Sequence, residues 1–407
     1  MQHERHYGMD WLRIGAFGLL ILYHVGMVFV PWGYHVKTEH PLDWVTIPML
    51  ASSAWRLPLL FGVSGFASAM LLARQGGRIG AFLGSRTPRL LLPLAFGAAV
   101  IVPPQTWVEL VTQHGYAKDY LTFWAGNYFT AGTIDGIIVP TWNHLWFVVY
   151  LWVYTLLLGL LLLLPASWRG TLGRLAGRAL SGPLVLLVPL ALLYVRLAIH
   201  WPGPEETHDL VHDLHAHEAY FGLFLFGFLL ARSDLVWAAI RRWWRVAAVL
   251  AVVGYAVVAA LNILYFAGVR WDLWGGLTSA VFRDLQGWNA IIALIGIADR
   301  YWNRDHRWRA TLNEAVFPFY VVHQTVIVVV GYWLIDQGIP PAVQFTVLVA
   351  ATVAGCWAFY LVGRSITPLR PFIGLRMRGT RGRCEAPECG SRLVLRTACR
   401  SAPQRRD

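Results

Sequence analysis

Three ionisable residues stand in the first apolar stretch of this sequence, MDWLRIGAFGLLILYHVGMVFVPW, residues 9–32. On an α-helix, the spacing of Arg13 and His24 turns through about 1,100°, so their side chains lie roughly 20° from a common face and about 16 Å apart along the axis. Asp10 has the spacing to pair with Arg13. Ionisable groups are costly in a bilayer and usually serve a function there. We therefore interpret Arg13 and His24 as a functional stripe, rather than as a snorkelling arginine and a structural histidine.

The composition predicts that this stretch belongs to a polytopic membrane protein. The 407 residues are 57% hydrophobic and 14% charged, whereas a soluble domain averages about 25% charged residues. We expect an all-α membrane bundle of about ten transmembrane helices, the first retained rather than cleaved as a signal peptide. The predicted spans are 10–32, 49–73, 88–108, 142–164, 182–200, 217–231, 246–268, 279–300, 312–335 and 342–364.

The basic charge follows this predicted topology. The net charge is +12, and most of the 34 Lys and Arg residues fall in alternate connections between the predicted spans. Cationic loops stay on the cytoplasmic side. Both termini are therefore expected to be cytoplasmic, and nucleic-acid binding is not expected.

Two further features lie outside the spans. Residues 370–407 are rich in Arg, Gly and Pro, which predicts a basic cytoplasmic tail, disordered or lying on anionic lipid, after a membrane domain of residues 1–369. His208, His212 and His215 follow the i, i+4, i+7 pattern of one helical face, which could hold zinc. We expect a polar surface facing an acceptor there, and no metal. The four cysteines imply no disulfide framework.

Six short motifs occur in an order that resembles the membrane acyltransferase 3 family. The first is DWLR with YH eleven residues on, at Asp10–Arg13 and Tyr23–His24. The others are RLPLLFGVSGFASAML (56–71), RTPRLLLP (86–93), HLWFVVYLW (144–152), FGFLLAR (226–232) and FPFYVVHQTVIV (317–328). Together they span most of residues 9–365.

This resemblance implies an enzyme of the bacterial inner membrane. It would move an acyl group from cytoplasmic acyl-CoA to a hydroxyl of a periplasmic glucan. The resemblance favours succinyl as the acyl group. Succinyl-CoA would be a co-substrate, and no permanently bound cofactor is implied. Glucan-synthesis proteins or a second copy of the chain would be partners. The alternatives are an O-acetyltransferase of the same family that acts on another cell-surface polysaccharide, and a transporter or flippase of an anionic or lipid-linked solute.

The chemistry of acyl transfer assigns roles to the motif residues. A hydroxyl needs a base and the reacting carbonyl needs a hydrogen-bond donor. His24 suits the base because histidine titrates near physiological pH, with Arg13 and Asp10 beside it in the catalytic set. Arg86, Arg89 and Arg13 suit the phosphates of the coenzyme, although Arg86 and Arg89 equally fit the topology rule.

Further motif residues are candidates for binding the acyl group or the acceptor. Arg56 would hold the second carboxylate of a succinyl group, and Glu218 would orient His24. Asn143, His144 and Trp146 would donate to the oxyanion or the acceptor, or would anchor the helix at the interface. Ser64 would line the pocket or would serve helix packing, and His323 would support the pocket or would bond a neighbouring helix. The complete substrate-binding set is Arg56, Ser64, Asn143, His144, Trp146, Glu218 and His323.

Overall fold

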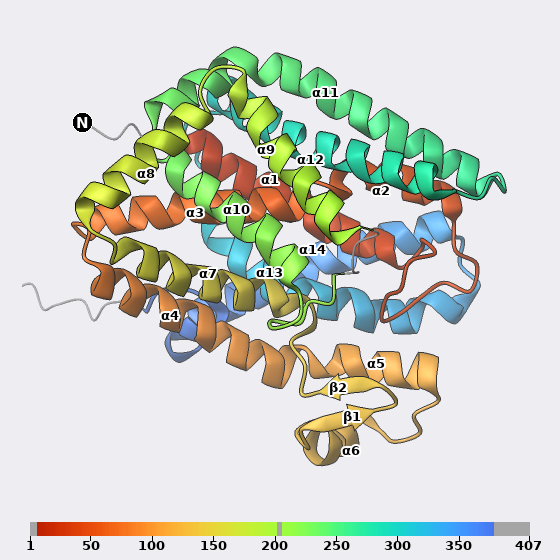
Figure 1. The fold of residues 1–407 in the computed structure, drawn as a ribbon. Coiled ribbons are helices and arrows are strands. Elements are labelled where there is room, and N and C mark those ends of the chain that lie inside the picture. The colour runs from red at the N-terminus through yellow and green to blue at the C-terminus, as the bar shows by residue number, and fades with distance from the viewer. Residues whose placement is uncertain (1–5, 202–205, 378–407) are drawn as a thin grey trace, which may run out of the picture.

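The computed structural model describes residues 6–201 and 206–377, most of them helical (Figure 1). The α-helices are α1 (Tyr7–Met27), α2 (Asp43–Ser53), α3 (Arg56–Arg74), α4 (Ile79–Phe96), α5 (Pro103–His114), α6 (Tyr120–Thr122), α7 (Trp146–Leu162), α8 (Ala166–Ala179), α9 (Leu184–His200), α10 (Leu214–Leu230), α11 (Asp234–Phe266), α12 (Leu273–Tyr301), α13 (Arg309–Leu334) and α14 (Pro341–Ser365). The short elements are the π-helical turns η1 (Gly97–Ile101) and η2 (Phe123–Asn127), the 3-10 turns η3 (Asn143–Leu145), η4 (Ile335–Gln337), η5 (Thr367–Leu369) and η6 (Pro371–Ile373), and the strands β1 (Gly132–Ile134) and β2 (Ile137–Val139).

The predicted all-α class is confirmed, and the chain is a multi-pass membrane protein. A helix or a pair of successive helices lies at each of the ten predicted spans. Within the described residues, six helical stretches are long and apolar enough to cross a membrane, and the bent pair α8–α9 would make a seventh. Helix α10 is apolar but short. The total of ten therefore stays a prediction.

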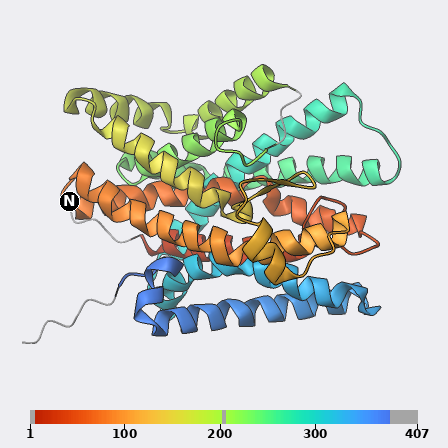
Figure 2. The same ribbon diagram turned by 90° about the horizontal axis from the view of Figure 1, so that it is seen from below.

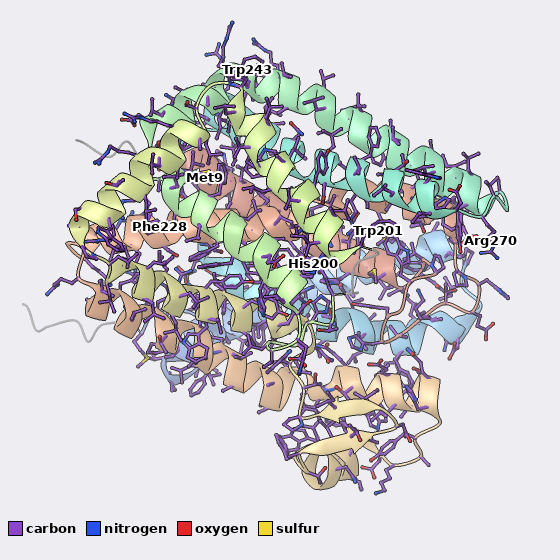
Figure 3. All side chains as sticks on the ribbon, viewed as in Figure 1. Met9, His200, Trp201, Phe228, Trp243 and Arg270 are labelled. Atoms are coloured by element: carbon purple, nitrogen blue, oxygen red, sulfur yellow. The ribbon has the colours of Figure 1, made fainter. Side chains whose placement is uncertain are left out.

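The two ends of the bundle differ in charge. Arginines gather at one end of the bundle, which we call the basic end (Figure 1). They lie in the connections after α3, α10 and α12 and in helix α8, which follows α7. His6 and Met377, the two ends of the described chain, line one cavity there. In Figure 3, Met9 lies toward this end and Arg270, in the connection after α11, lies at the opposite end.

Helix α1 is held in the middle of the bundle by α3, α12 and α13. Its last turn is closed by Lys37, whose Nζ donates to the carbonyls of Met27, at 2.9 Å, and of Val30. Burial of the ammonium group lowers the pKa of Lys37 to about 8. This contact satisfies carbonyls that the helix end leaves free, and it fixes the turn that follows His24.

The segment between α5 and α7 folds into a short helix and two short strands. Strands β1 and β2 pair antiparallel, with Gly132 opposite Val139. With α6 they form a small lobe beside α5, visible at the bottom of Figure 1. Leu110, Phe123, Tyr128 and Val139 make a separate apolar core there. The aromatic residues of this segment therefore fold on one another and on α5.

The membrane domain extends beyond its predicted end at residue 369. Ile373 and Leu375 are buried against α13 and α14. The buried Arg370 donates to the carbonyls of Arg364, at 2.9 Å, and Arg376, at 2.7 Å. Residues 370–377 are thus part of the packed structure. The rest of the predicted tail, with Cys384, Cys389 and Cys399, lies outside the described residues.

Helices α3 and α10 pack with their backbones in close contact because glycines face each other. A Cβ on Gly65 would lie 1.8 Å from the Phe224 carbonyl oxygen, and a Cβ on Gly227 would lie 1.8 Å from that of Gly62. Small residues allow this approach in membrane bundles. The small-residue packing predicted for the Ser64–Gly65 segment is therefore present at Gly65.

Gly227→Ala should force α10 away from α3 and lower the thermal stability of the purified protein in detergent. Overpacking of this kind costs about 1–3 kcal/mol. Gly222→Ala on the same helix is the matched control, because a Cβ there meets no atom within 4 Å. Equal melting temperatures for the two variants would contradict the proposed backbone contact.

Candidate functional site

A cavity of about 1020 Å³ opens at the basic end of the bundle. Its size is at the upper limit of ordinary ligand pockets, about 300–1,000 Å³. Its lining includes predicted residues from three helices: Asp10 and Arg13 from α1, Ser64 from α3, and Arg86 and Arg89 from α4. We call it the basic cavity. The fold thus brings the predicted coenzyme-binding residues together.

The structure adds residues to this cavity that motif spacing did not predict. Arg74 and Gln75 line it from the end of α3, Ser85 lines it from α4, and Arg376 lines it from the segment predicted to be tail. Five arginines and one carboxylate, that of Asp10, are therefore among its described lining residues. A cavity with this balance of charge favours an anionic ligand.

The predicted pairing of Asp10 with Arg13 is wrong. Asp10 forms an ion pair with Arg309 of α13 at 2.6 Å and accepts a hydrogen bond from Asn313 Nδ2 at 3.0 Å. Arg13 donates to the Asn313 carbonyl at 3.0 Å. The i, i+3 rule applies within one helix, whereas here a neighbouring helix supplies a better-placed cation. Asp10 therefore joins α1 to α13. Among the described residues Arg13 forms no ion pair with a carboxylate, and Asp10 acts on it only as a nearby charge.

Arg86 is held in place by a neutral partner. Its Nε donates to Thr155 Oγ1 on α7 at 2.9 Å, and Thr155 is fully buried. This bond orients the guanidinium without neutralising it, so its charge stays available to a ligand.

The inner end of the basic cavity is closed by aromatic rings. Phe17, Phe147 and Tyr320 line it, and the Tyr320 ring lies 5.7 Å from that of Phe17 and 6.0 Å from that of Phe147. Beyond Tyr320 lie the histidines, with the His323 ring 5.9 Å away. The cavity therefore leads from the arginines toward the predicted base.

His24 and His323 form a direct hydrogen bond between α1 and α13. His24 Nδ1 lies 2.9 Å from His323 Nε2. His323 is fully buried, and its Nδ1 lies 2.7 Å from the Tyr320 carbonyl. A carbonyl only accepts, so Nδ1 of His323 carries the proton and Nε2 of the neutral ring accepts from His24. His24 then holds its proton on Nδ1, and its Nε2 lone pair is free to act as a base.

The loop between α1 and α2 packs on the side of His24 away from His323. The Tyr34 ring stacks on that of His24 at 6.3 Å. The next residue, His35, hydrogen bonds to Glu109 of α5 at 2.5 Å. No hydrogen bond to His24 Nε2 occurs within the described part of the chain. The ring is thus oriented while its basic nitrogen has no partner.

His144 is placed beside the pair but is already engaged. Its Nε2 donates to the Val321 carbonyl at 3.1 Å, and its Nδ1 accepts from Gln105 at 3.4 Å. Tyr320 donates to the His144 carbonyl. With both ring nitrogens bonded, the predicted donation from His144 to a substrate is not available in this arrangement. His144 joins the turn η3, which leads into α7, to helix α13.

A buried amide network surrounds this layer. Gln105, from the helix after the wide turn η1, donates to Thr325 at 2.7 Å and accepts from Gln324 at 3.1 Å and from Asn143 at 3.3 Å. The predicted Asn143 therefore serves the network. The motif spacing did not indicate Gln105 and Gln324, because an uncharged amide is not part of a recognisable catalytic pattern. A polar side chain in a membrane span is nevertheless a sign of function.

Arg56 is a buried cation at the start of α3. Its side chain is 4% exposed, its guanidinium carbon lies 3.5 Å from the ring centroid of Tyr23, and Nη1 donates weakly to Ser52 at 3.4 Å. Its Nε has no hydrogen-bond partner, and no carboxylate pairs with it, among residues 6–201 and 206–377. A buried charge without a counter-ion is costly. Because Tyr23 precedes His24, this guanidinium is available for an anionic group near the base.

Trp146 and Glu218 lie in other contacts. Trp146 is buried and stacks on His208, with ring centroids 4.4 Å apart. Glu218 binds His200 of α9 at 3.1 Å. The predicted orientation of His24 by Glu218 is therefore not found, and His323 occupies that role.

The single helical face on which His208, His212 and His215 could have held zinc is not formed. Helix α10 begins at Leu214, so His208 and His212 lie before it. His212 binds Asp209 at 2.9 Å. The hydrogen bond from the Val211 amide, and next to it the contact with His212, lower the pKa of Asp209. His215 instead binds Arg196 at 2.9 Å. Among the described residues no group of His, Cys, Asp or Glu is arranged to hold a metal ion.

Comparison with known proteins shows which sequences this chain resembles. Glucans biosynthesis protein C from Escherichia coli O1:K1 and from Escherichia coli O157:H7 strain EC4115 are each 26% identical over 157 residues, which is 38% of this chain and 38% of the relative. The chain thus matches about two fifths of the length of these relatives. No solved structure is significantly similar to it.

The family model described as an acyltransferase domain, that of the acyltransferase 3 family, matches residues 6–361. That range contains the basic cavity residues of α1, α3 and α4 and the histidine pair. The chain therefore belongs to the acyltransferase 3 family and is a membrane acyltransferase.

Proposed function

We propose that this enzyme transfers a succinyl group from succinyl-CoA, bound from the cytoplasm, to a hydroxyl of a glucan outside the inner membrane. The single observation that carries the proposal is the arrangement along α1: the basic cavity at Arg13, then Tyr320, then the His24–His323 pair. An anion site and an oriented base are the two things that acyl transfer from a phosphate-bearing thioester requires.

The coenzyme would enter at the basic end. Its phosphates would bind Arg86, Arg89 and Arg13, with Arg74 and Arg376 at the same cavity. The extended pantetheine arm would then pass Phe17 and Phe147. The helical spacing of Arg13 and His24, about 16 Å, is the distance that this arm must bridge. Tyr320 would have to turn aside for the thioester to reach the base.

The proton path follows from the hydrogen bonds. His24 Nε2 would take the proton of the acceptor hydroxyl as its oxygen attacks the thioester carbonyl. His323 Nε2, accepting from His24 Nδ1, would stabilise the imidazolium that forms. The tetrahedral intermediate would collapse by breaking the carbon–sulfur bond, and the proton on Nε2 would pass to the coenzyme thiolate. The products are the ester and free coenzyme A, and His24 is neutral again.

Arg56 supports a dicarboxylic acyl group. Its buried, carboxylate-free guanidinium next to Tyr23 would bind the free carboxylate of a succinyl group while the other end reacts at His24. An acetyl group would leave this cation without a counter-ion. The same-family acetyl transfer is therefore the weaker alternative.

The glucan acceptor rests on the relatives. Their printed name, Glucans biosynthesis protein C, concerns glucan synthesis, and the similarity covers 38% of the chain. The side of the acceptor rests on the charge pattern, which favours a cytoplasmic basic end and an extracytoplasmic approach to His24. Glucan-synthesis proteins or a second copy of the chain are the partners that this proposal implies.

His24→Ala should abolish transfer and leave coenzyme binding nearly intact, because a general base acts in the transition state. Loss of a general base typically costs about 10²–10⁴ in rate. The measurement is succinylation of glucan by purified protein in vesicles, followed by mass spectrometry, with coenzyme binding measured in parallel. Near-normal turnover by a well-folded variant would refute the catalytic role of His24.

Arg86→Gln with Arg89→Gln should weaken succinyl-CoA binding by at least about tenfold, because two charge-assisted contacts to phosphate are lost. The difference from the unmodified protein should shrink as salt rises, since screening weakens the native contacts. Arg300→Gln with Arg307→Gln is the matched control, because both residues are exposed at the basic end and neither lines the cavity. If both pairs weaken binding equally, the cavity is not the coenzyme site.

Arg56→Gln should raise the KM for succinyl-CoA by about 10–100-fold and leave the KM for acetyl-CoA nearly unchanged, because only succinyl carries the second carboxylate. Arg56→Lys keeps the charge and should lose less. Steady-state kinetics with the two donors measure this difference. An equal loss for both donors would assign Arg56 to structure or to the transfer step and remove the argument for succinyl.

A further inference from the structure

A second, mostly apolar space of about 1410 Å³ lies on the other side of α10 from the histidine pair. Leucines of α7, α9 and α10 make up much of its lining, and Trp288 of α12 also contributes. We call this space the apolar groove. It reaches from Arg232, at the basic end, to Ile199 and Glu218, near the far end of α9. In Figure 3, Phe228 and His200 lie toward these two ends.

The groove is framed by two helices that meet at a sharp angle. Helices α8 and α9 are bent by 101° at the break between them, and they form an outer edge of the bundle in Figure 2. Trp168, Leu172 and Leu175 of α8 follow i, i+4, i+7 and are more than half exposed, at 63%, 54% and 55%. This pattern is typical of a helix lying in the membrane interface. Helix α9 therefore runs into the membrane while α8 lies across its edge.

Cations gather where α8 meets the groove. Arg169, Arg174 and Arg178 of α8 and Arg232 after α10 line its basic end. Asp234 is the one described carboxylate that lines this end, and Glu218 lies at the other. None of these four arginines forms an ion pair within the described residues. The groove thus has an apolar interior and a cationic mouth.

We propose that the apolar groove binds an anionic phospholipid, with its phosphate at Arg169 and Arg232 and its acyl chains between α9 and α10. The anionic headgroup of such a lipid matches the cationic end of the groove, and its acyl chains match the apolar interior. Juxtamembrane arginines attract anionic headgroups by about 1 kcal/mol each. A phospholipid also fits the bend, because the headgroup would lie under the interfacial helix while the chains run along the helix that enters the membrane.

The lining residues of α8 leave room for the lipid. Gly170, Gly173 and Gly177 line the groove, and a Cβ on Gly173 would meet no atom within 4 Å. The missing side chains let a ligand approach the α8 backbone between the arginines. A basic partner, such as residues beyond Met377 of this chain, would be repelled by the same cations. This inference does not depend on the proposed acyl donor or acceptor.

Lipid binding by the full chain tests the proposal. The detergent-purified protein would be titrated with dioleoyl phosphatidylglycerol and with dioleoyl phosphatidylcholine, and bound lipid would be counted by native mass spectrometry. These lipids share their chains and differ in headgroup charge. We expect one phosphatidylglycerol site, about tenfold or more tighter than the phosphatidylcholine site. Arg169→Gln with Arg232→Gln should remove most of that difference. Equal affinity for the two lipids would overturn the proposal.

Two controls locate the site. Arg300→Gln with Arg307→Gln removes the same charge from the basic end outside the groove and should leave phosphatidylglycerol affinity unchanged. Gly173→Leu adds a side chain where a Cβ meets no atom within 4 Å, and it should block the site and weaken the binding of both lipids. If the control pair loses as much affinity as the groove pair, the effect is general surface charge. Displacement of the lipid by inorganic phosphate alone, or full binding by the Gly173→Leu variant, would also contradict the proposal.

Discussion

The organisation of this protein depends on one constraint: an ionisable or polar side chain inside an apolar bundle must find a partner within the protein. Helix α1 carries Asp10, Arg13 and His24, and each makes a polar contact with α13, through Arg309, Asn313 and His323 respectively. Three polar contacts along one helix pair set both its register and its rotation. Because the remaining helices pack around this pair, the position of the histidines follows from these contacts.

The same constraint explains the exceptions. Arg56 is buried with its Nε unbonded in the described structure, and His24 Nε2 likewise has no protein partner. Other buried polar atoms of the described residues, such as Asn289 Oδ1 and Gln344 Oε1, also lack a partner. Arg56 and His24 differ from these because they lie together beside the histidine pair, where Arg56 packs on Tyr23. Both belong to the α1–α3 side of the histidine layer, and both are suited to a ligand.

The bundle separates binding from chemistry by depth. Arginines gather at the basic end, where water is close and charge is inexpensive to keep, and the histidines lie deeper, behind the rings of Phe17, Phe147 and Tyr320. Tyr320 belongs to both layers, since its ring lines the basic cavity and its carbonyl sets the tautomer of His323. Any movement of this residue would therefore alter access to the base and the proton position on it together.

The helical class, the positions of the apolar helices, and the grouping of Arg13, Arg86 and Arg89 could be predicted from the sequence, because hydrophobic period and charge asymmetry are local properties of the chain. The common face of Arg13 and His24 was predictable for the same reason. The partners of these residues were not. Arg309 replaces Arg13 beside Asp10, His323 replaces Glu218 beside His24, and Arg376 joins the cavity from a segment that reads as tail. Each of these contacts joins residues far apart in sequence, and spacing along one helix carries no information on which other helix lies against it. Only the packing of the bundle decides that, because every polar group takes the best partner available in three dimensions.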